Sequence, residues 1–183
     1  MPLPFLTNQE RKFYEQIPMI DEVEMQQHFY LTQANKIFLL AFNGELNRIS
    51  VAVQLCLLRY LGYVPRNWNI EVDESIIQFV AQQPYNKPRY NSLHEYGKWD
   101  KVRSNHLQAI LKHLKFRKWQ PLMDEPILEK WLVEQGMEHD NERYLLETMC
   151  QKLRQNRVFR PAIGTLEGIV GYIKELLEAE TYQ

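Results

Sequence analysis

The chain has 183 residues, of which 45% are hydrophobic and 25% charged, and its formal net charge is -1 at pH 7. This length and composition are those of a globular protein with one domain or two small ones. No apolar run approaches the roughly 18 residues that a membrane-spanning helix needs. The first residues lack the basic and apolar regions of a secretory signal, so we expect neither a membrane-spanning helix nor a secretory signal.

Every periodic segment in the first half of the chain predicts a helix, and none alternates like a strand. The first predicted helix stops before Pro18. The longest one, residues 45–62, is apolar on nearly every side, which predicts the central helix of a bundle, ending at Gly62. The last one ends before Pro84. These helices are predicted to begin after Thr7, after Asp21, near Gln33, at about residue 45 and after Asp73.

Residues 82–98 have two prolines, one glycine and almost no aliphatic side chain, which predicts a linker. Beyond it, an apolar stripe from Leu107 to Leu114 predicts an amphipathic helix. Three more helices are expected, one opening at Pro126, one around Leu145 and one after Thr165.

The predicted fold class is therefore all-α, with two small helical units. These are residues 1–84 and 99–183, joined by a basic linker over 85–98 that contains Pro and Tyr. Units of this size are typical of helix-turn-helix domains, and equally of other small bundles.

Positive charge is concentrated in the middle of the chain. Residues 86–122 have nine Lys and Arg against two Asp and Glu, whereas residues 1–85 and 123–183 are both acidic. Such an asymmetry indicates a local interaction with an anionic partner.

The predicted helix over the basic segment separates its side chains by chemistry. Opposite the apolar stripe it presents Asn105, Gln108 and Lys112, flanked by His106 and His113. Arg103 stands at its N-terminal edge, and its C-terminal edge carries Lys115, Arg117 and Lys118. Asn and Gln pair with adenine edges, Arg with guanine, and flanking cations hold phosphates. This is the pattern of a helix that enters a duplex groove, although a solvated helix face has a similar composition.

Three further basic groups have two interpretations each. Cations in the linker form either an arm along DNA or a plain connection whose tyrosines pack on neighbouring helices. Two arginines on one stripe of residues 45–62 contact either phosphates or the acids Glu22 and Glu24. A basic corner near residues 152–160 contacts DNA or simply suits a helix C-terminus. The cations concerned are Lys87, Arg89 and Lys98; Arg48 and Arg59; and Arg154 and Arg157, with Lys152 and Arg160.

Catalysis has little support in the sequence. There is no nucleotide-binding loop, nucleophile elbow or zinc-protease motif. His106 and His113 lie two turns apart, but no Cys or carboxylate cluster completes a metal site. Cys56 and Cys150 are expected to be free thiols in a reducing compartment. We therefore expect a binding module with no metal and no cofactor.

Several segments, taken in order, resemble one family. NRISVAVQLCLLRYLG at residues 47–62 resembles NRLGFALQLCLLRYPG, a signature of the N-terminal region of transposases of class II replicative transposons, the Tn-three family. VRSNHL at 102–107 resembles TRREHL, KFR at 115–117 resembles GFR, and RPAIGTLEGIV at 160–170 resembles LPGLSTLERLV. Arg48, Arg59, Arg103, His106 and Arg117 match the family. The departures are Ser50, Leu61, Ser104 and Lys115.

The resemblance implies sequence-specific recognition of transposon terminal inverted repeats, by tandem helix-turn-helix units. The Asp-Asp-Glu metal site of the family lies hundreds of residues further on, so this chain is expected to lack it, as an excised domain or a short relative. The implied partners are double-stranded DNA and the rest of the transposase or a second subunit, with no membrane and no small-molecule substrate. The implied location is the bacterial cytoplasm, at the nucleoid.

The alternative is a helical interaction or regulatory domain of the transposition machinery that reads no bases. Under the DNA-binding interpretation, the residues expected to contact DNA are Arg48, Arg59, Lys87, Arg89, Lys98, Lys101, Arg103, Asn105, His106, Gln108, Lys112, Arg117, Lys118, Arg154 and Arg157.

Overall fold

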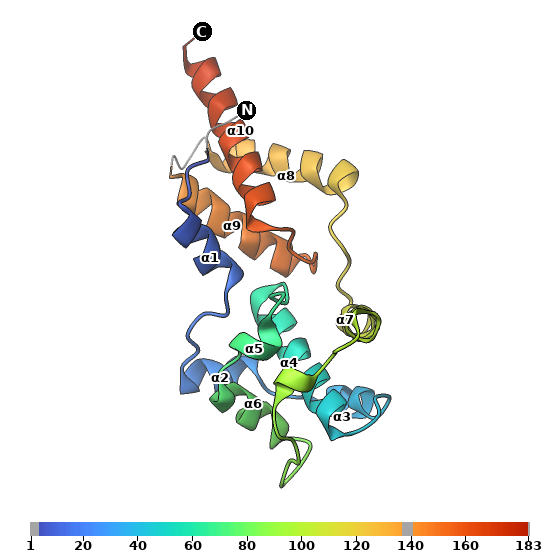
Figure 1. Cartoon of the computed structure of the whole chain (residues 1–183). Coiled ribbons are helices and arrows are strands. Elements are labelled where there is room, and N and C mark those ends of the chain that lie inside the picture. Colours follow the sequence, from blue (N-terminus) through green and yellow to red (C-terminus); the bar gives the residue numbers. More distant parts are fainter. Residues whose placement is uncertain (1–3, 137–140, 183) are drawn as a thin grey trace. The chain divides into compact units, whose positions relative to one another are not determined.

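The structure is a computed structural model that describes residues 4–136 and 141–182. In these ranges it contains ten α-helices, one short 3-10 helix and a single isolated bridge, between Arg117 and Val158 (Figure 1). The predicted all-α class is confirmed.

The helices form two compact units, which we describe separately. The central unit is Ile17–Phe116, and the terminal unit combines Met1–Gln16 with Arg117–Gln183. This division differs from the predicted units 1–84 and 99–183. The first helix joins the terminal unit, and the helix of the basic segment joins the central one.

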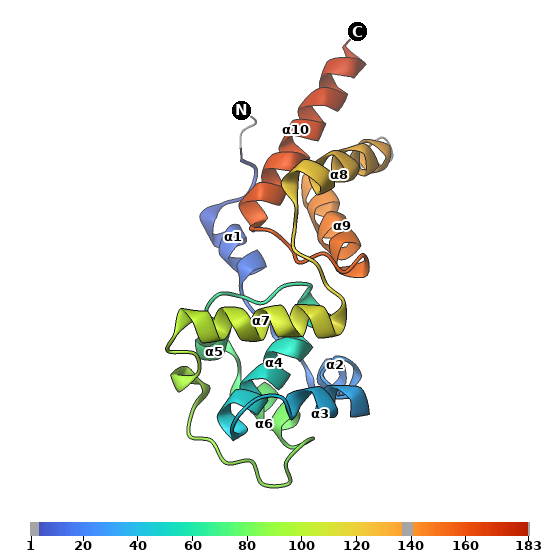
Figure 2. The ribbon, with the colours of Figure 1, turned by 90° about the vertical axis from the view of Figure 1, so that its right-hand side faces the viewer.

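The central unit is built around α4 (Glu45–Leu61), as the sequence predicted. Every residue of α4 from 49 to 58 is buried. At its end the Gly62 N–H donates to the Leu58 carbonyl at 2.8 Å, with Gly62 at φ 80 in the left-handed region that favours glycine. Around α4 lie α2 (Glu22–His28), α3 (Gln33–Leu39), α5 (Trp68–Glu71), α6 (Glu74–Ala81) and α7 (Asp100–Leu114) (Figure 2).

Helix starts in both units follow capping signals in the sequence. The side chains of Thr7, Asp21 and Asp73 each accept a backbone N–H two or three residues on, as predicted. Thr32 caps α3 in the same way, and Asn35 returns the bond to form a capping box. These local bonds fix where the helices begin.

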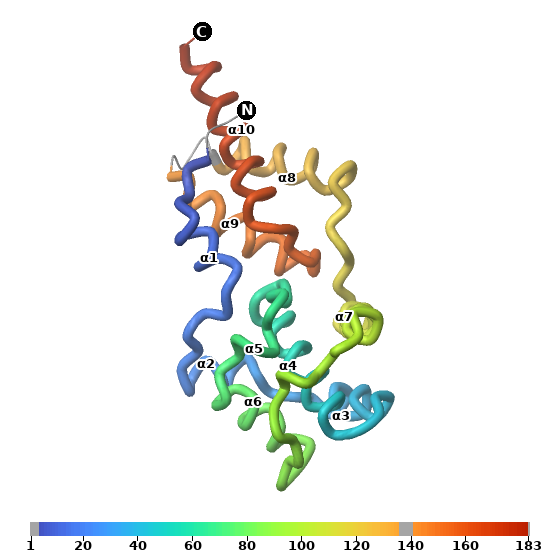
Figure 3. The backbone as a smooth tube through the Cα atoms, in the orientation of Figure 1, coloured from blue at the N-terminus to red at the C-terminus, as the bar shows by residue number. Residues whose placement is uncertain are grey.

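The segment between α6 and α7 lies inside the central unit rather than between units (Figure 3). Its short 3-10 helix η1 (Leu93–Glu95) buries Leu93, and Tyr96 is 2% exposed against Trp68. Asn69 Nδ2 donates to the Leu93 carbonyl at 3.3 Å. The prolines and the scarcity of aliphatic residues correctly predicted that this segment forms no long helix. They did not predict that the segment packs on the central unit, because the side chains of Leu93 and Tyr96 are enough to anchor it.

The terminal unit packs α1 (Asn8–Glu15), α8 (Pro121–Gly136), α9 (Glu142–Gln155) and α10 (Ile163–Thr181) around one apolar core. Helix α8 begins five residues before the predicted start, so Pro126 lies inside it rather than opening it. Pro121 is the first residue instead, where a missing N–H costs nothing.

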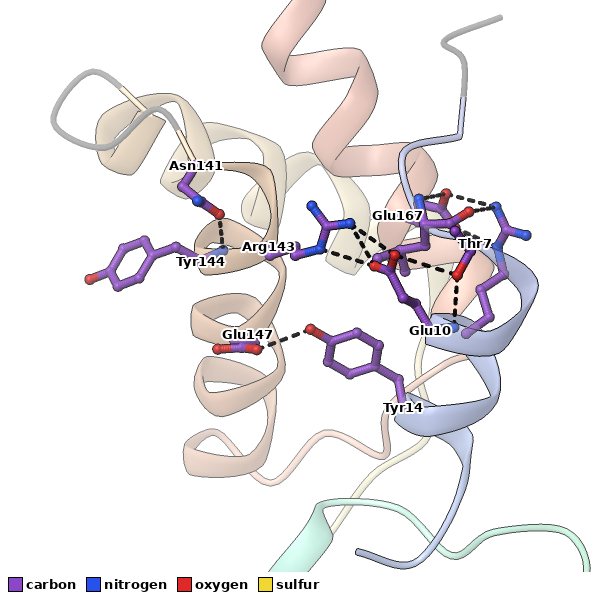
Figure 4. Close-up of polar contacts among 10 residues, drawn as sticks. Thr7, Glu10, Tyr14, Asn141, Arg143, Tyr144, Glu147 and Glu167 are labelled. Atoms are coloured by element: carbon purple, nitrogen blue, oxygen red, sulfur yellow. Dashed lines mark hydrogen bonds and ion pairs between the residues drawn. The ribbon is translucent and has the colours of Figure 1, made fainter.

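Helix α1 is attached to this unit by polar contacts between residues far apart in the sequence (Figure 4). Arg11 binds both carboxylate oxygens of Glu167, at 2.8 and 3.0 Å, and the Leu6 N–H donates to the same group. The hydrogen bond from Arg11, together with the backbone N–H, lowers the pKa of the Glu167 carboxyl. Arg143 pairs with Glu10, and the Tyr14 hydroxyl donates to Glu147 at 3.0 Å.

Candidate nucleic-acid interface

One side of α7 is polar, basic and exposed. We call it the outer face. At about 100° per residue, the spacing of the residues on this face places all of them in one sector of about 100° around the helix axis. They are three lysines and three neutral hydrogen-bonding residues, with no acid among them: Lys101, Ser104, Asn105, Gln108, Lys112 and Lys115. Lys115 ends the helix in a left-handed conformation, at φ 58.

The opposite side of α7 packs on the central unit. Ile110 is fully buried and Leu111 nearly so, while Leu107 and Leu114 are half-buried. The predicted apolar stripe therefore faces inward, and four of the predicted DNA-contacting residues come together on the outer face. These four are Lys101, Asn105, Gln108 and Lys112.

The two histidines of α7 do not flank the outer face but point into the unit. Gln54 Nε2 donates to the Tyr96 hydroxyl at 2.9 Å, and that hydroxyl is hydrogen-bonded to His106 Nδ1 at 2.7 Å. Asn35 Oδ1 accepts the Thr32 N–H, so Asn35 Nδ2 donates to His113 Nε2, 2.9 Å away. His113 also stacks on Phe38, with ring centroids 4.2 Å apart. His113 Nε2 thus accepts a hydrogen bond, and burial lowers the pKa of both imidazoles.

This geometry makes the central unit sensitive to mild acid. Protonation would turn His113 Nε2 into a donor that faces the Asn35 amide donor, and it would place a positive charge on both half-buried rings. Histidine titrates near 6.5 in an unfolded chain. Because the folded pKa values lie below this, the unfolded chain takes up protons first, and stability falls as the pH drops below about 6.5. The urea midpoint should fall between pH 7.5 and pH 5.5.

The matched variant His106→Gln/His113→Gln should show a flatter pH dependence over the same range. Carboxyls with lowered pKa values, such as Asp124 and Glu167, affect stability only when the pH falls below about 4, their ordinary pKa. Their effect therefore lies outside the range from pH 7.5 to pH 5.5. Equal pH dependence in wild type and variant would contradict the assigned hydrogen bonds.

Arg103 also lies on the inner side of α7. Its Nη2 donates to the Arg66 carbonyl at 2.8 Å. Gly97, at φ 65, leaves room for its stem, since a Cβ there would stand 2.2 Å from Arg103 Cγ. Arg103 therefore fixes the segment before α7 and is not part of the outer face.

The arginines of α4 also bind backbone carbonyls. Arg48 Nε donates to Phe42 O at 2.8 Å. Arg59 donates to the carbonyls of His28 and Tyr30 and lies over the Tyr30 ring. Ion pairs with Glu22 or Glu24 are not among those found in the described residues.

The other predicted contacts are divided between the two units. Lys87, Arg89 and Lys98 are exposed along the segment before α7, where the Arg89 N–H donates to Glu45. Arg117 belongs to the terminal unit and holds Asp124 with two hydrogen bonds, which lower the pKa of that carboxyl. Lys118, Arg154 and Arg157 belong to the terminal unit as well.

Sequence reasoning missed two polar residues of the central unit, Ser104 and Lys36. Ser104 was noted only as a departure from the family pattern, although its spacing puts it on the outer face. Lys36 was overlooked, although it follows Gln33 by three residues on α3.

The two units differ in charge. The central unit has eleven Lys and Arg against nine Asp and Glu, and the terminal unit has eleven against fourteen.

The described part of the chain holds no group of three His, Cys, Asp or Glu placed to bind a metal. None of its helices is both long and apolar enough to cross a bilayer. Cys56 and Cys150 are free thiols, as predicted, and burial raises the pKa of Cys56 to about 12.

The fold and the outer face define an all-α module that presents one basic, amide-bearing helix. Residues 5–173 match a family described as "Domain of unknown function (DUF4158)", and the chain belongs to this family.

Similar proteins include three transposases. The transposase for transposon Tn1546 of Enterococcus faecium is 28% identical over 97% of this chain. The transposase for Tn501 of Pseudomonas aeruginosa is 34% identical over 68% of it, and that for gamma-delta of Escherichia coli K12 is 24% identical over 96%. The matched regions span 17%, 12% and 18% of those proteins. The resemblance to Tn-three-family transposases is therefore confirmed.

Proposed function

We propose that this chain is the non-catalytic N-terminal DNA-binding module of a transposase, and that it recognises the terminal inverted repeats of a transposon. One observation carries the proposal: the outer face of α7 gathers three lysines and three hydrogen-bonding side chains, all exposed, with no acid. The transposase relatives support a role in transposition.

The outer face has the chemistry that reads a major groove. Helix α7 has 15 residues, about 22 Å, and a B-DNA major groove about 12 Å wide admits a helix lengthwise. Asn105 and Gln108 would pair with adenine edges near the middle of the helix. Lys101 and Lys112, one near each end, would bind phosphates and set the register.

Other elements have supporting roles in this proposal. The exposed Lys87, Arg89 and Lys98 would add phosphate contacts beside α7. The pair α2 and α3, joined by residues 29–32, is proposed as a helix-turn-helix-like element. The terminal unit would connect the DNA-binding surface to the rest of a transposase or to a second subunit. Such a module would act at the bacterial nucleoid.

The test is fluorescence anisotropy with a labelled duplex that carries the terminal inverted repeat of the encoding transposon, and with a scrambled duplex, each over a salt series. Tighter binding to the repeat, with log K falling steeply with log salt, is expected of a phosphate-anchored sequence reader. Equal weak binding to both duplexes would overturn the proposal.

A second candidate function is a protein-interaction domain that reads no bases. The terminal unit favours it, because α8 exposes Leu122 at 98%, Ile127 at 60% and Met123 at 44%. Exposed apolar side chains on one helix are typical of interaction surfaces. Equal binding to the two duplexes would support this candidate.

A further inference from the structure

Helix α3 and the residue that caps its end turn two apolar side chains outward, Ile37 and Leu40. Gln33, Lys36, Ile37 and Leu40 follow at the spacing i, i+3, i+4, i+7 and so share one side of the helix. Ile37 is 60% exposed and Leu40 64%, whereas Asn35 and Leu39, on the other side, are buried. A surface helix normally buries such a stripe, so this one is available to a partner.

The outward side of α3 borders a hollow of about 380 Å³ within the central unit. This volume is in the range of ligand sites. Its floor and walls combine aliphatic, amide and cationic side chains from three parts of the unit. They are Gln33, Lys36, Ile37, Leu39, Leu40, Arg48, Gln83, Pro84 and Tyr85.

The hollow is positively charged and its lining contains no Asp or Glu. Arg48 Nε is held by the Phe42 carbonyl, which fixes the guanidinium while its other nitrogens keep their donors. Neither Lys36 nor Arg48 is in an ion pair among the described residues. The residues from 29 to 43 contain no acid either. Two cations without a carboxylate partner, beside an apolar wall, suit a phosphate that carries an apolar group.

We propose that this hollow binds a phosphodiester segment of duplex DNA, with Lys36 and Arg48 at a phosphate and Ile37 and Leu40 against the adjoining sugar or a thymine methyl. The inference rests on the proposed function, because it takes DNA as the partner. Phosphate contacts fix position, and apolar side chains contact thymine methyls.

The hollow is a second contact and not an extension of the outer face. Asn35 and Phe38, which touch His113 of α7, lie on the side of α3 away from the stripe. The central unit would therefore hold DNA at two places, one that reads bases on α7 and one that anchors the backbone at α3.

Lys36→Gln is expected to reduce the slope of log K on log salt by about 0.9. If the variant and wild type bind equally at 1 M salt, the variant should bind about eightfold more weakly at 0.1 M. The loss should be equal for the terminal-repeat duplex and the scrambled duplex, because a phosphate contact carries no sequence information. Lys36→Arg should restore both the affinity and the slope. Thermal unfolding followed by circular dichroism checks that each variant is folded.

The matched control is Lys12→Gln, which removes the same charge from an exposed position on α1 of the terminal unit. It should leave affinity and slope unchanged. If Lys36→Gln and Lys12→Gln behave alike while wild type still prefers the repeat, the hollow does not bind DNA and the proposed function stands. If wild type shows no preference but Lys36→Gln weakens binding to both duplexes, the hollow holds phosphate and the sequence recognition is wrong.

Discussion

Lys101→Glu combined with Lys112→Glu should reduce the affinity for the terminal-repeat duplex about 100-fold or more at 0.1 M salt. The two lysines lie three turns apart on the outer face of α7 and are both exposed. Losing two phosphate contacts reduces the slope of log K on log salt by about 1.8, so the loss of affinity at 0.1 M salt is roughly 60-fold relative to the loss at 1 M. The two new carboxylates add repulsion. Anisotropy measures the loss, and circular dichroism should show an intact helical fold.

Net charge alone could weaken DNA binding, so the comparison needs a variant of equal charge. Lys12→Glu with Lys130→Glu makes the same change at two exposed positions of the terminal unit. This control should cost far less affinity than the α7 variant. Equal losses would contradict a localised interface on α7.

Ile110→Ala should lower the free energy of unfolding by about 2–5 kcal/mol, the usual cost of removing a buried Ile side chain. Ile110 is fully buried on the side of α7 that packs on α4. The effect should centre on the central unit, since α7 belongs to it. Urea denaturation gives the magnitude, and amide hydrogen exchange gives the location.

Gln108→Ala, on the exposed side of the same helix, should stay within about 0.5 kcal/mol of wild type. In Ile110→Ala, the amides of α4 should lose protection, while those of α9 and α10 keep theirs. Loss of protection in α9 and α10 instead would contradict the division into units and favour the one drawn from the sequence.

Helices and their ends were predictable because the signals are local. The capping side chains of Thr7, Asp21 and Asp73 reach backbone groups two or three positions away, and Gly62 ends α4 by its own backbone conformation. The division into units was not predictable in this way. It depends on contacts such as Arg11 with Glu167, 156 residues apart, and on Leu93 and Tyr96 anchoring a segment without helical periodicity.

The outer face was predictable from the helical period. The same period also shows that Arg103 does not belong to it. Arg103 precedes Ile110 by seven residues, two turns, and so shares its inward side. His106 and His113 lie at the edges of that side, where the sequence gives no direction. Their orientation depends on Tyr96 and Asn35, partners from other elements, which only the fold brings near.

The most direct test of base reading by α7 is the ratio of affinities for the terminal-repeat and scrambled duplexes, measured for wild type and for Asn105→Ala/Gln108→Ala at one salt concentration. If these amides pair with bases, the ratio should fall at least tenfold, since each such pair contributes about 1–3 kcal/mol of discrimination. Affinity for the scrambled duplex and the salt slope should stay the same. An unchanged ratio would contradict the assignment of α7 as the helix that reads the transposon end.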